Sequence, residues 1–483
     1  MIIIKQYCLD FECILYALLI KSLLIIPLWG CVNISFAQSI DIRNELLRMD
    51  IPLLEIQTVD NVEPTCDQIL PPPGCWGAGI TNATKVPGRL RITYGGNIIF
   101  DTGEYNKGKS GMTVKIRGNT SAYMKIKPYK IKLQKSADLF FRGDYYKYAD
   151  KDYLLVVDQN FYRKVGFKVN EIVGLQWTPH YQYVNVMING DYRGLYMLLE
   201  SVSRNERSRI NVDKTGFIFE YDPYWWNEDV YVVSPTPLPW TMHYTFKYPD
   251  SDDITDDELC YFRDMIEQVE KSIYDGSYPD YIDVNSFASW MIGHDILGNN
   301  DGAGSNIFLT KRDNTDSTKV MMANMWDFDW IFYRDEMWDA AHDYFFFPNL
   351  FNNVNGAFKD AYVDKWNEIK DYIFEELILY LDNFADTINV DDYNKSIKFT
   401  NDRGGGAYES VQVYVDRAKT WLNKRNNWLS EAIRDLENST GIKEVYVSSK
   451  FNEKDVYYNM LGQKVNKPNT GIYIRNGEKI LVK

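Results

Sequence analysis

Between residues 290 and 330 the chain carries two short apolar runs separated by a polar turn, and this pattern constrains the fold more than any other stretch. The runs are residues 307–309 and 320–323, and the turn covers residues 311–319. Short apolar runs on either side of turn-forming residues predict two antiparallel strands joined as a hairpin. Acidic residues precede the first run and follow the second. The hairpin is therefore expected to present carboxylates at one edge.

The polar residues that flank this hairpin have a spacing with chemical meaning. Asp301 lies in a Gly-rich turn, five positions before Asn306, and Asp327 and Asp329 follow the second run. Phosphoryl transfer needs one group that orients the attacking hydroxyl and oxygen ligands that hold divalent metal on the nucleotide phosphates. Asp-x-x-x-x-Asn is the spacing of the kinase catalytic loop, and Asp-Phe-Asp stands where a kinase has Asp-Phe-Gly. An ordinary turn is the alternative interpretation, because Asp, Asn and Gly are the commonest turn residues.

Length and composition predict a globular protein with an acidic surface. The chain has 483 residues, of which 45% are hydrophobic and 15% aromatic, enough for a large core of two lobes or more. The net charge is 53 minus 67, or −14, and no block of Lys and Arg occurs. Nucleic acid is therefore not an expected partner.

The first 38 residues are largely apolar, carry Lys5 near the start and end in small residues. This pattern predicts a secretory signal that is removed near Ala37 or Gln38. A membrane anchor is one alternative, since the apolar region is long. Lipidation at Cys31 is another, because residues 28–31 form a degenerate lipobox. Each interpretation exports the body of the protein to the cell surface or medium, and no membrane span is expected after signal removal.

The cysteines and histidines indicate no zinc site. Outside the leader, Cys66 and Cys75 flank a Pro-rich turn and are predicted to form a disulfide, which leaves Cys260 unpaired. The four histidines are far apart in sequence, so Ser-His-Asp and Cys-His catalysis are weak hypotheses. His294 is predicted to be a packed helical residue.

The N-terminal half reads as short strands and turns. The predicted strands cover residues 53–56, 88–93, 97–100, 112–116 and 129–133. In the last of these, alternation puts Tyr129, Ile131 and Leu133 on one face. Lys130 and Lys132 lie on the other face, where a lysine can reach a phosphate.

Several segments in this half carry specific motifs. They are Arg-Gly-Asn-Thr-Ser at 117–121, Lys-Pro-Tyr-Lys at 127–130, Tyr-Leu-Leu at 153–155 with Arg163 downstream, and a hairpin at 184–200 with Asn-Gly at its turn. Together with Asn-x-Asp-Gly…Asn and Trp-Asp-Phe-Asp, they resemble the CotH (spore-coat protein H) kinase family, over roughly residues 51–332. The resemblance implies an α+β fold like that of an atypical protein kinase, with a β-rich N-lobe at about 51–200 and an α-rich C-lobe at about 201–436.

The resemblance also implies roles for individual residues. Asp301 would orient the acceptor hydroxyl, and the metal, Mg²⁺ or Mn²⁺, would bind Asn306 and Asp327 with Asp329 assisting. ATP phosphates would be neutralised by Lys130, with Lys127 as the competing choice. The remaining candidates for phosphate contact and for pairing with a lysine are Arg163 and Glu200. Solvated strand faces for the lysines, a surface ion pair for Arg163 and a strand-end turn for Glu200 are the alternatives.

One feature departs from ordinary kinases. The N-terminal half has no Gly-x-Gly-x-x-Gly loop, so residues 117–121 are the nearest candidate to cover the phosphates. In the C-terminal half, residues 365–387 and 408–436 are predicted to be long amphipathic helices, with the glycines at 404–406 as a break. The acidic run at 252–258 is interpreted as a helix start, and calcium binding is its minor alternative.

Residues 442–483 alternate apolar and polar residues around an Asn-Gly turn and predict a small β module. The segment resembles the C-terminal sorting domains of Bacteroidetes type IX secretion cargo, which implies contact with the secretion machinery. A structural β appendage is the alternative.

The sequence thus predicts an exported, metal-dependent protein serine/threonine kinase that acts on surface or secreted proteins. The competing hypothesis is a catalytically inactive kinase-fold adhesin or carbohydrate-binding protein. It is motivated by the aromatic residues between Tyr224 and Trp240, which can stack on sugars.

Overall fold

The computed structural model describes residues 41–158, 160–236, 241–302, 304–404, 406–440, 456–458, 463–465, 471–475 and 478–482. The predicted signal segment and its alternatives, a membrane anchor and a lipidated Cys31, fall outside these residues. Two compact units divide the chain, residues 1–423 and residues 424–483. No helix in the described ranges is long and apolar enough to cross a membrane.

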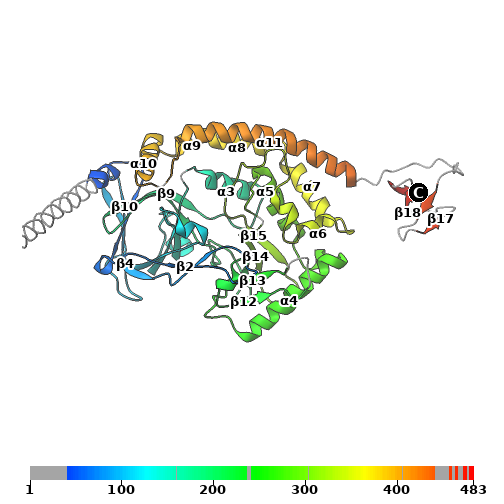
Figure 1. The fold of residues 1–483 in the computed structure, drawn as a ribbon, viewed down its shortest axis with the longest axis horizontal. Helices are drawn as coiled ribbons and strands as arrows, with labels where there is room; N and C mark the ends of the chain where they lie inside the picture. Colours follow the sequence, from blue (N-terminus) through cyan, green and yellow to red (C-terminus); the bar gives the residue numbers. More distant parts are fainter. Residues whose placement is uncertain are drawn as a thin grey trace, which may run out of the picture. The chain divides into compact units, whose positions relative to one another are not determined.

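The first unit has a mixed α+β fold that begins with an eight-stranded sheet (Figure 1). In spatial order the strands are β1 (Leu53–Thr58), β9 (Tyr181–Ile188), β10 (Asp191–Glu200), β8 (Asp150–Val156), β7 (Tyr129–Ala137), β6 (Met112–Ile116), β4 (Val86–Tyr94) and β5 (Asn97–Asp101). The predicted alternation in β7 is confirmed, since Tyr129, Ile131 and Leu133 are buried. The opposite face carries Lys130 and Lys132, as the period of two requires.

This sheet closes on itself. β1 pairs in parallel with β9 and also antiparallel with β4, so every strand except β5 belongs to a closed ring. The inward side chains of the ring form one apolar core, which includes Leu54, Val114, Ile131 and Leu198. A small separate hairpin, β2 (Asp67–Ile69) and β3 (Gly79–Thr81), lies between β1 and β4 in sequence.

A second, five-stranded antiparallel sheet follows. Its order is β12 (Tyr231–Val233), β13 (His243–Tyr248), β11 (Phe217–Tyr221), β14 (Ile307–Lys311) and β15 (Val320–Asn324). The hairpin predicted from the two apolar runs is therefore confirmed as β14 and β15. Helix α5 (Val284–Leu297) packs against β15 and is buried all round, including His294, as predicted.

The other helices of the first unit surround these sheets. They are α2 (Tyr145–Tyr148), α3 (Tyr162–Ile172), α4 (Asp256–Asp275), α6 (Phe347–Phe351), α7 (Ala357–Ile369), α8 (Ile373–Asp382), α9 (Phe384–Thr387), α10 (Val390–Asp402) and the start of α11 (Val411–Thr440). The acidic run does start a helix, because Thr255 and Glu258 form a capping box at α4. The prediction of a single helix over residues 365–387 is wrong. The amide of Tyr372 bonds back to Ile369, and this turn separates α7 from α8 so that both can face the core.

The predicted disulfide is also wrong, since Cys66 and Cys75 are both free. The β2–β3 hairpin explains why. Cys66 directly precedes β2, at the open end of the hairpin where Asp67 pairs with Thr81. Cys75 lies in the connecting loop at the other end, where its amide bonds to Pro72. The hairpin therefore holds the two residues at opposite ends, and Cys66 packs against the apolar core instead.

The described residues of the second unit include a four-stranded antiparallel sheet, in the order β17 (Lys464–Val465), β16 (Tyr457–Tyr458), β18 (Gly471–Arg475) and β19 (Glu478–Val482). Tyr457 is buried there and packs against Val465 and Tyr473. A sorting role for this segment stays a prediction.

Candidate active site

The segment after β15 fixes two aspartates on either side of a buried phenylalanine. Phe328 is fully buried and packs edge-on against Phe167 of α3, with ring centroids 5.4 Å apart. A Cβ atom at Gly166 would overlap the ring of Phe328, so only glycine permits this contact. Asp327, with φ of 60°, and Asp329 consequently leave the segment in fixed positions.

Arg163 joins both aspartates to α3. Its guanidinium donates a 2.6 Å hydrogen bond to Asp329 and lies 3.6 Å from Oδ1 of Asp327. Oδ1 of Asp327 is buried and accepts no hydrogen bond from the described residues. A buried acceptor left without a donor costs about 1–3 kcal/mol, so this oxygen suits an additional ligand.

Asp301 lies in the loop after α5, beside the same aspartates. The side chain of Asn299 ties the two segments together, because its Nδ2 donates to the backbone of Asp327 at 2.8 Å and its Oδ1 accepts from the amide of Asp301 at 3.2 Å. Desolvation and, as the smaller cause, the negative charge of Asp327 together raise the pKa of Asp301 to about 6. Asp301 is thus a carboxylate whose proton affinity suits acid–base work near neutral pH.

Asn306 directly precedes β14 in a left-handed conformation, with φ of 63°. Because Phe308 pairs with Asn324, Asn306 and Asp327 lie at the same end of the β14–β15 hairpin. Nδ2 of Asn306 donates to Ser305 at 2.8 Å, which leaves its amide oxygen for another partner.

The oxygen atoms of these side chains are suitable ligands for a divalent cation. No group of three His, Cys, Asp or Glu side chains with the arrangement of a metal site occurs in the described part of the chain. The candidate ligands are instead carboxylates and an amide oxygen, the hard donors that Mg²⁺ prefers. The observation that favours this fit is Oδ1 of Asp327, which is buried and accepts no hydrogen bond from the described residues.

The two candidate lysines have other partners. Nζ of Lys130 lies 3.1 Å from Asp152 on the neighbouring strand, and Nζ of Lys127 donates to the carbonyl of Ala122 at 2.6 Å. No contact between described residues joins either lysine to Asp301 or Asp327.

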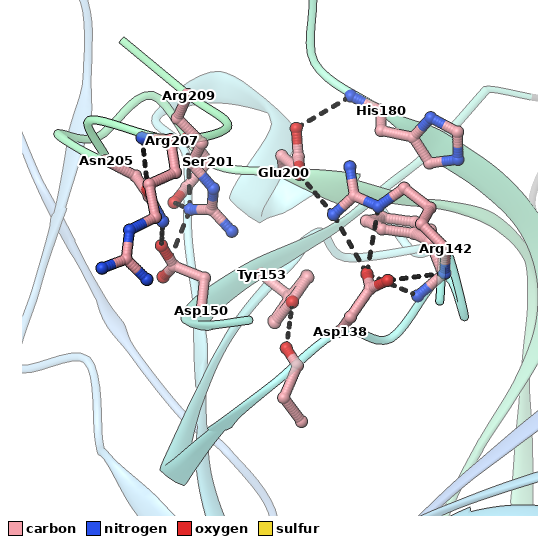
Figure 2. Close-up of polar contacts among 12 residues, drawn as sticks. Asp138, Arg142, Asp150, Tyr153, His180, Glu200, Ser201, Asn205, Arg207 and Arg209 are labelled. Atoms are coloured by element: carbon pink, nitrogen blue, oxygen red, sulfur yellow. Dashed lines mark hydrogen bonds and ion pairs between the residues drawn. The ribbon is translucent and has the colours of Figure 1, made fainter. Parts of the chain in front are cut away.

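Glu200, at the end of β10, belongs to a separate ion-pair network (Figure 2). Its carboxylate accepts from the guanidinium of Arg142 at 2.9 Å and from the amide of His180 at 3.0 Å. Arg142 also pairs with Asp138 at 3.0 Å. Arginine thus occupies the place where a lysine partner of Glu200 was expected.

Two further basic residues lie on β6 and at its end: Lys115, which was not singled out from the sequence, and Arg117, the first residue of the segment 117–121 that was predicted to cover the phosphates. Burial lowers the pKa of Arg117, as does the like charge of Arg163, whereas Asp327 and Glu220 raise it. No described residue accepts a hydrogen bond from the Arg117 guanidinium. Burial also lowers the pKa of Lys115, which lies on the same face of β6. Alternation from buried Val114 and Ile116 is the signal that could have identified this pair.

Residues 114–429 match the model of the CotH kinase protein family. No curated protein matches the chain. Among solved structures, the chain is similar to the Helicobacter pylori proinflammatory kinase CtkA, at 11% identity over 64% of this chain and 95% of that chain, with a TM-score of 0.26. A score this low carries no argument about shared function.

Proposed function

The chain belongs to the CotH kinase protein family, and from this premise we propose that it transfers the γ-phosphate of ATP to Ser or Thr hydroxyls of other proteins. In this reaction Asp301 accepts the proton of the acceptor hydroxyl. The hydroxyl oxygen bonds to the γ-phosphorus as the bond from phosphorus to the leaving ADP oxygen breaks.

The observation that carries this proposal is that two aspartates and two arginines, from three segments distant in sequence, interact with one another. Asp327 and Asp329 follow β15, Arg163 begins α3, and Arg117 follows β6, and their charges act on one another. Phosphoryl transfer is catalysed mainly by positioning and by charge stabilisation, which such a group supplies. In the proposal Arg117, which has no hydrogen-bond acceptor among the described residues, holds phosphate oxygens.

Asp327 and Asn306 would hold Mg²⁺ or Mn²⁺, with Asp329 assisting, and the metal would neutralise charge on the nucleotide phosphates. Arg163 holds the two aspartates near each other and oriented, since one nitrogen of its guanidinium lies 2.6 Å from Asp329 and 3.6 Å from Asp327. The predicted phosphate contacts of Lys127 and Lys130 remain predictions, as does the predicted role of Glu200. Mutagenesis of each residue would test its role.

The proposal is tested with purified protein, γ-labelled ATP and either Mg²⁺ or Mn²⁺, in the presence of a generic protein acceptor. We expect label on the native protein or the acceptor, and a loss of at least about 100-fold in Asp301→Ala and Asp327→Ala. Circular dichroism must show that both variants are folded. Full activity in both variants would reject this site.

The aromatic segment behind the carbohydrate-binding alternative is engaged within the protein. The ring of Trp225 stacks on His243 at 4.0 Å and contacts Tyr231 at 4.7 Å. This packing accounts for Trp225 without a sugar. A glycan array separates the hypotheses, because saturable binding that is lost in Trp225→Ala and Trp226→Ala would favour an adhesin.

We further propose that the protein is exported through its N-terminal segment and that residues 442–483 engage a secretion machinery. Export would bring the kinase to surface or secreted acceptors. Deletion of residues 442–483 in the native host should retain the protein inside the cell envelope, as fractionation and immunoblotting would detect. Unchanged release would leave the segment as a structural appendage.

A further inference from the structure

The β2–β3 hairpin, which precedes the family-matched residues, is fastened to the segment beside the candidate site. Nδ2 of Asn227 donates to the carbonyl of Ile80 at 2.8 Å, and Nε1 of Trp226 donates to the carbonyl of Trp76 at 3.2 Å. The hydroxyl of Tyr123 also donates to the carbonyl of Gly79. Backbone groups of the hairpin are thus held at three points, so its loop has a defined position.

The loop between β2 and β3 packs closely against Tyr224. The rings of Trp76 and Tyr224 lie 5.5 Å apart, tilted by 60°. Gly77, at φ of 74°, approaches so closely that a Cβ atom there would lie 2.6 Å from the Tyr224 ring. Any side chain at position 77 would therefore displace either the loop or the ring of Tyr224.

Tyr224 connects the hairpin to the reacting groups. Burial raises the pKa of Tyr224, a hydrogen bond with Thr120 lowers it, and the charges of Asp301 and Asp327 raise it. Strand pairing places this segment at the same edge, because β11 ends at Tyr221, which pairs with Ile307, the residue directly after the loop of Asp301 and Asn306.

Trp76 itself remains 63% exposed although its backbone and one edge are fixed. A large apolar ring held in place beside a site, with most of its surface in water, gains little within the protein and is available to a partner. Tryptophans with a fixed position are frequent anchors of recognition.

We propose that Trp76 is a specificity-determining residue that binds an apolar side chain next to the Ser or Thr of the acceptor protein. The inference rests on the proposed kinase function and deepens it by naming the acceptor class. The acceptor is favoured over the nucleotide base because the ring of Tyr224 contacts Trp76, and among the aspartates of the site the charge of Asp301 acts on Tyr224 ahead of that of Asp327.

The test uses Ser/Thr peptides whose positions beside the acceptor are Phe, Leu or Gly, with the full-length native protein and Trp76→Ala. We expect the native enzyme to prefer Phe and Leu, and Trp76→Ala to raise KM for these peptides by about tenfold while KM for ATP and for Gly peptides stays constant. Leu70→Ala is the matched control, because Leu70 follows β2 in the same hairpin and is 72% exposed. A thermal melt checks that each variant is folded.

Two results would overturn the inference: equal KM values for native protein and Trp76→Ala with every peptide, or a raised KM for ATP, which would assign Trp76 to the nucleotide base. Binding of fluorescein-labelled peptides, measured by polarisation, keeps the test separate from catalysis. Peptide binding that depends on Trp76 in a protein that transfers no phosphate would support this surface and reject the kinase proposal. Binding that is the same without Trp76 would reject this surface alone.

Discussion

Arg163, in the first turn of α3, donates a 2.6 Å hydrogen bond to the carboxylate of Asp329, although the two residues are 166 positions apart in the chain. The contact brings the beginning of a helix to the segment that follows β15. It sets the positive charge of a buried guanidinium beside two carboxylates, so we expect both the stability of the protein and its proposed reaction to depend on it.

Replacing Arg163 by Ala should destabilise the protein by about 1.5–3 kcal/mol, the value of a charge-assisted hydrogen bond, because Asp327 and Asp329 would repel each other without the cation. Urea unfolding measures this difference. Lys398→Ala is the control, since its pair with Asp402 is exposed and should contribute about 0.3–0.5 kcal/mol. Equal losses in both variants would contradict a central role for Arg163.

The rate of phosphate transfer should fall as pH falls through about 6, the raised pKa of Asp301, because the protonated carboxyl cannot accept the hydroxyl proton. A profile of kcat/KM from pH 5 to 8 tests this expectation. A rate that stays flat through pH 6 would contradict the role of Asp301 as a base.

The raised pKa of Asp301 also predicts that the stability of the folded protein falls as pH rises, whereas the transfer rate rises. Its pKa is higher in the folded than in the unfolded protein, so between pH of about 4 and 6 the folded state holds the extra proton. The stabilising contribution is complete below this window and is lost as pH rises through it. Urea unfolding of native protein without added metal should show this loss, and Asp301→Asn should lack it.

Arg117→Ala should weaken ATP binding by about 10- to 100-fold, since a charge-assisted hydrogen bond to phosphate would be lost. Lys130→Ala should change ATP binding little, because Lys130 already pairs with Asp152 at 3.1 Å. Calorimetric titration of both variants distinguishes the two assignments. A large loss of ATP affinity in Lys130→Ala alone would assign phosphate binding to Lys130 of β7.

Gly166→Ala should cost about 1–3 kcal/mol and lower activity, because the added methyl would push Phe328 and move the aspartates beside it. Gly304→Ala is the control for stability only, because it lies in the loop of Asp301; a Cβ atom there would meet nothing within 4 Å, and surface changes usually stay within about 0.5 kcal/mol. Thermal melts and transfer assays measure both effects. Normal activity in Gly166→Ala would show that Phe328 can move without displacing Asp327.

Much of the local structure could be predicted, because it depends on neighbouring residues. Alternation identified β6 and β7, and Asn189-Gly190 forms the expected turn between β9 and β10. That Asp301 and Asp327 lie close together could be predicted for a similar reason. Each lies in a turn next to a strand of one hairpin, so a local pattern brings both near the same edge.

The basic side of the site depends on contacts that are distant in sequence. A period of two says that Lys130 points away from the core, but it does not say which outward face meets the aspartates. That outcome depends on how the sheet and α3 pack, which leaves Lys130 beside Asp152 and brings Arg117 to Asp327. The same limit applies to Cys66 and Cys75, whose separation follows from strand pairing.

The closure of the first sheet through β1 bears on how fragments of this protein should be made. A recombinant fragment that starts at residue 114, where the family match begins, would lack β1, β4 and β5. The edges of β6 and β9 would then lose their neighbours and present unpaired backbone groups to other molecules. We expect such a fragment to aggregate, because the unit that folds begins well before the segment by which the family is detected.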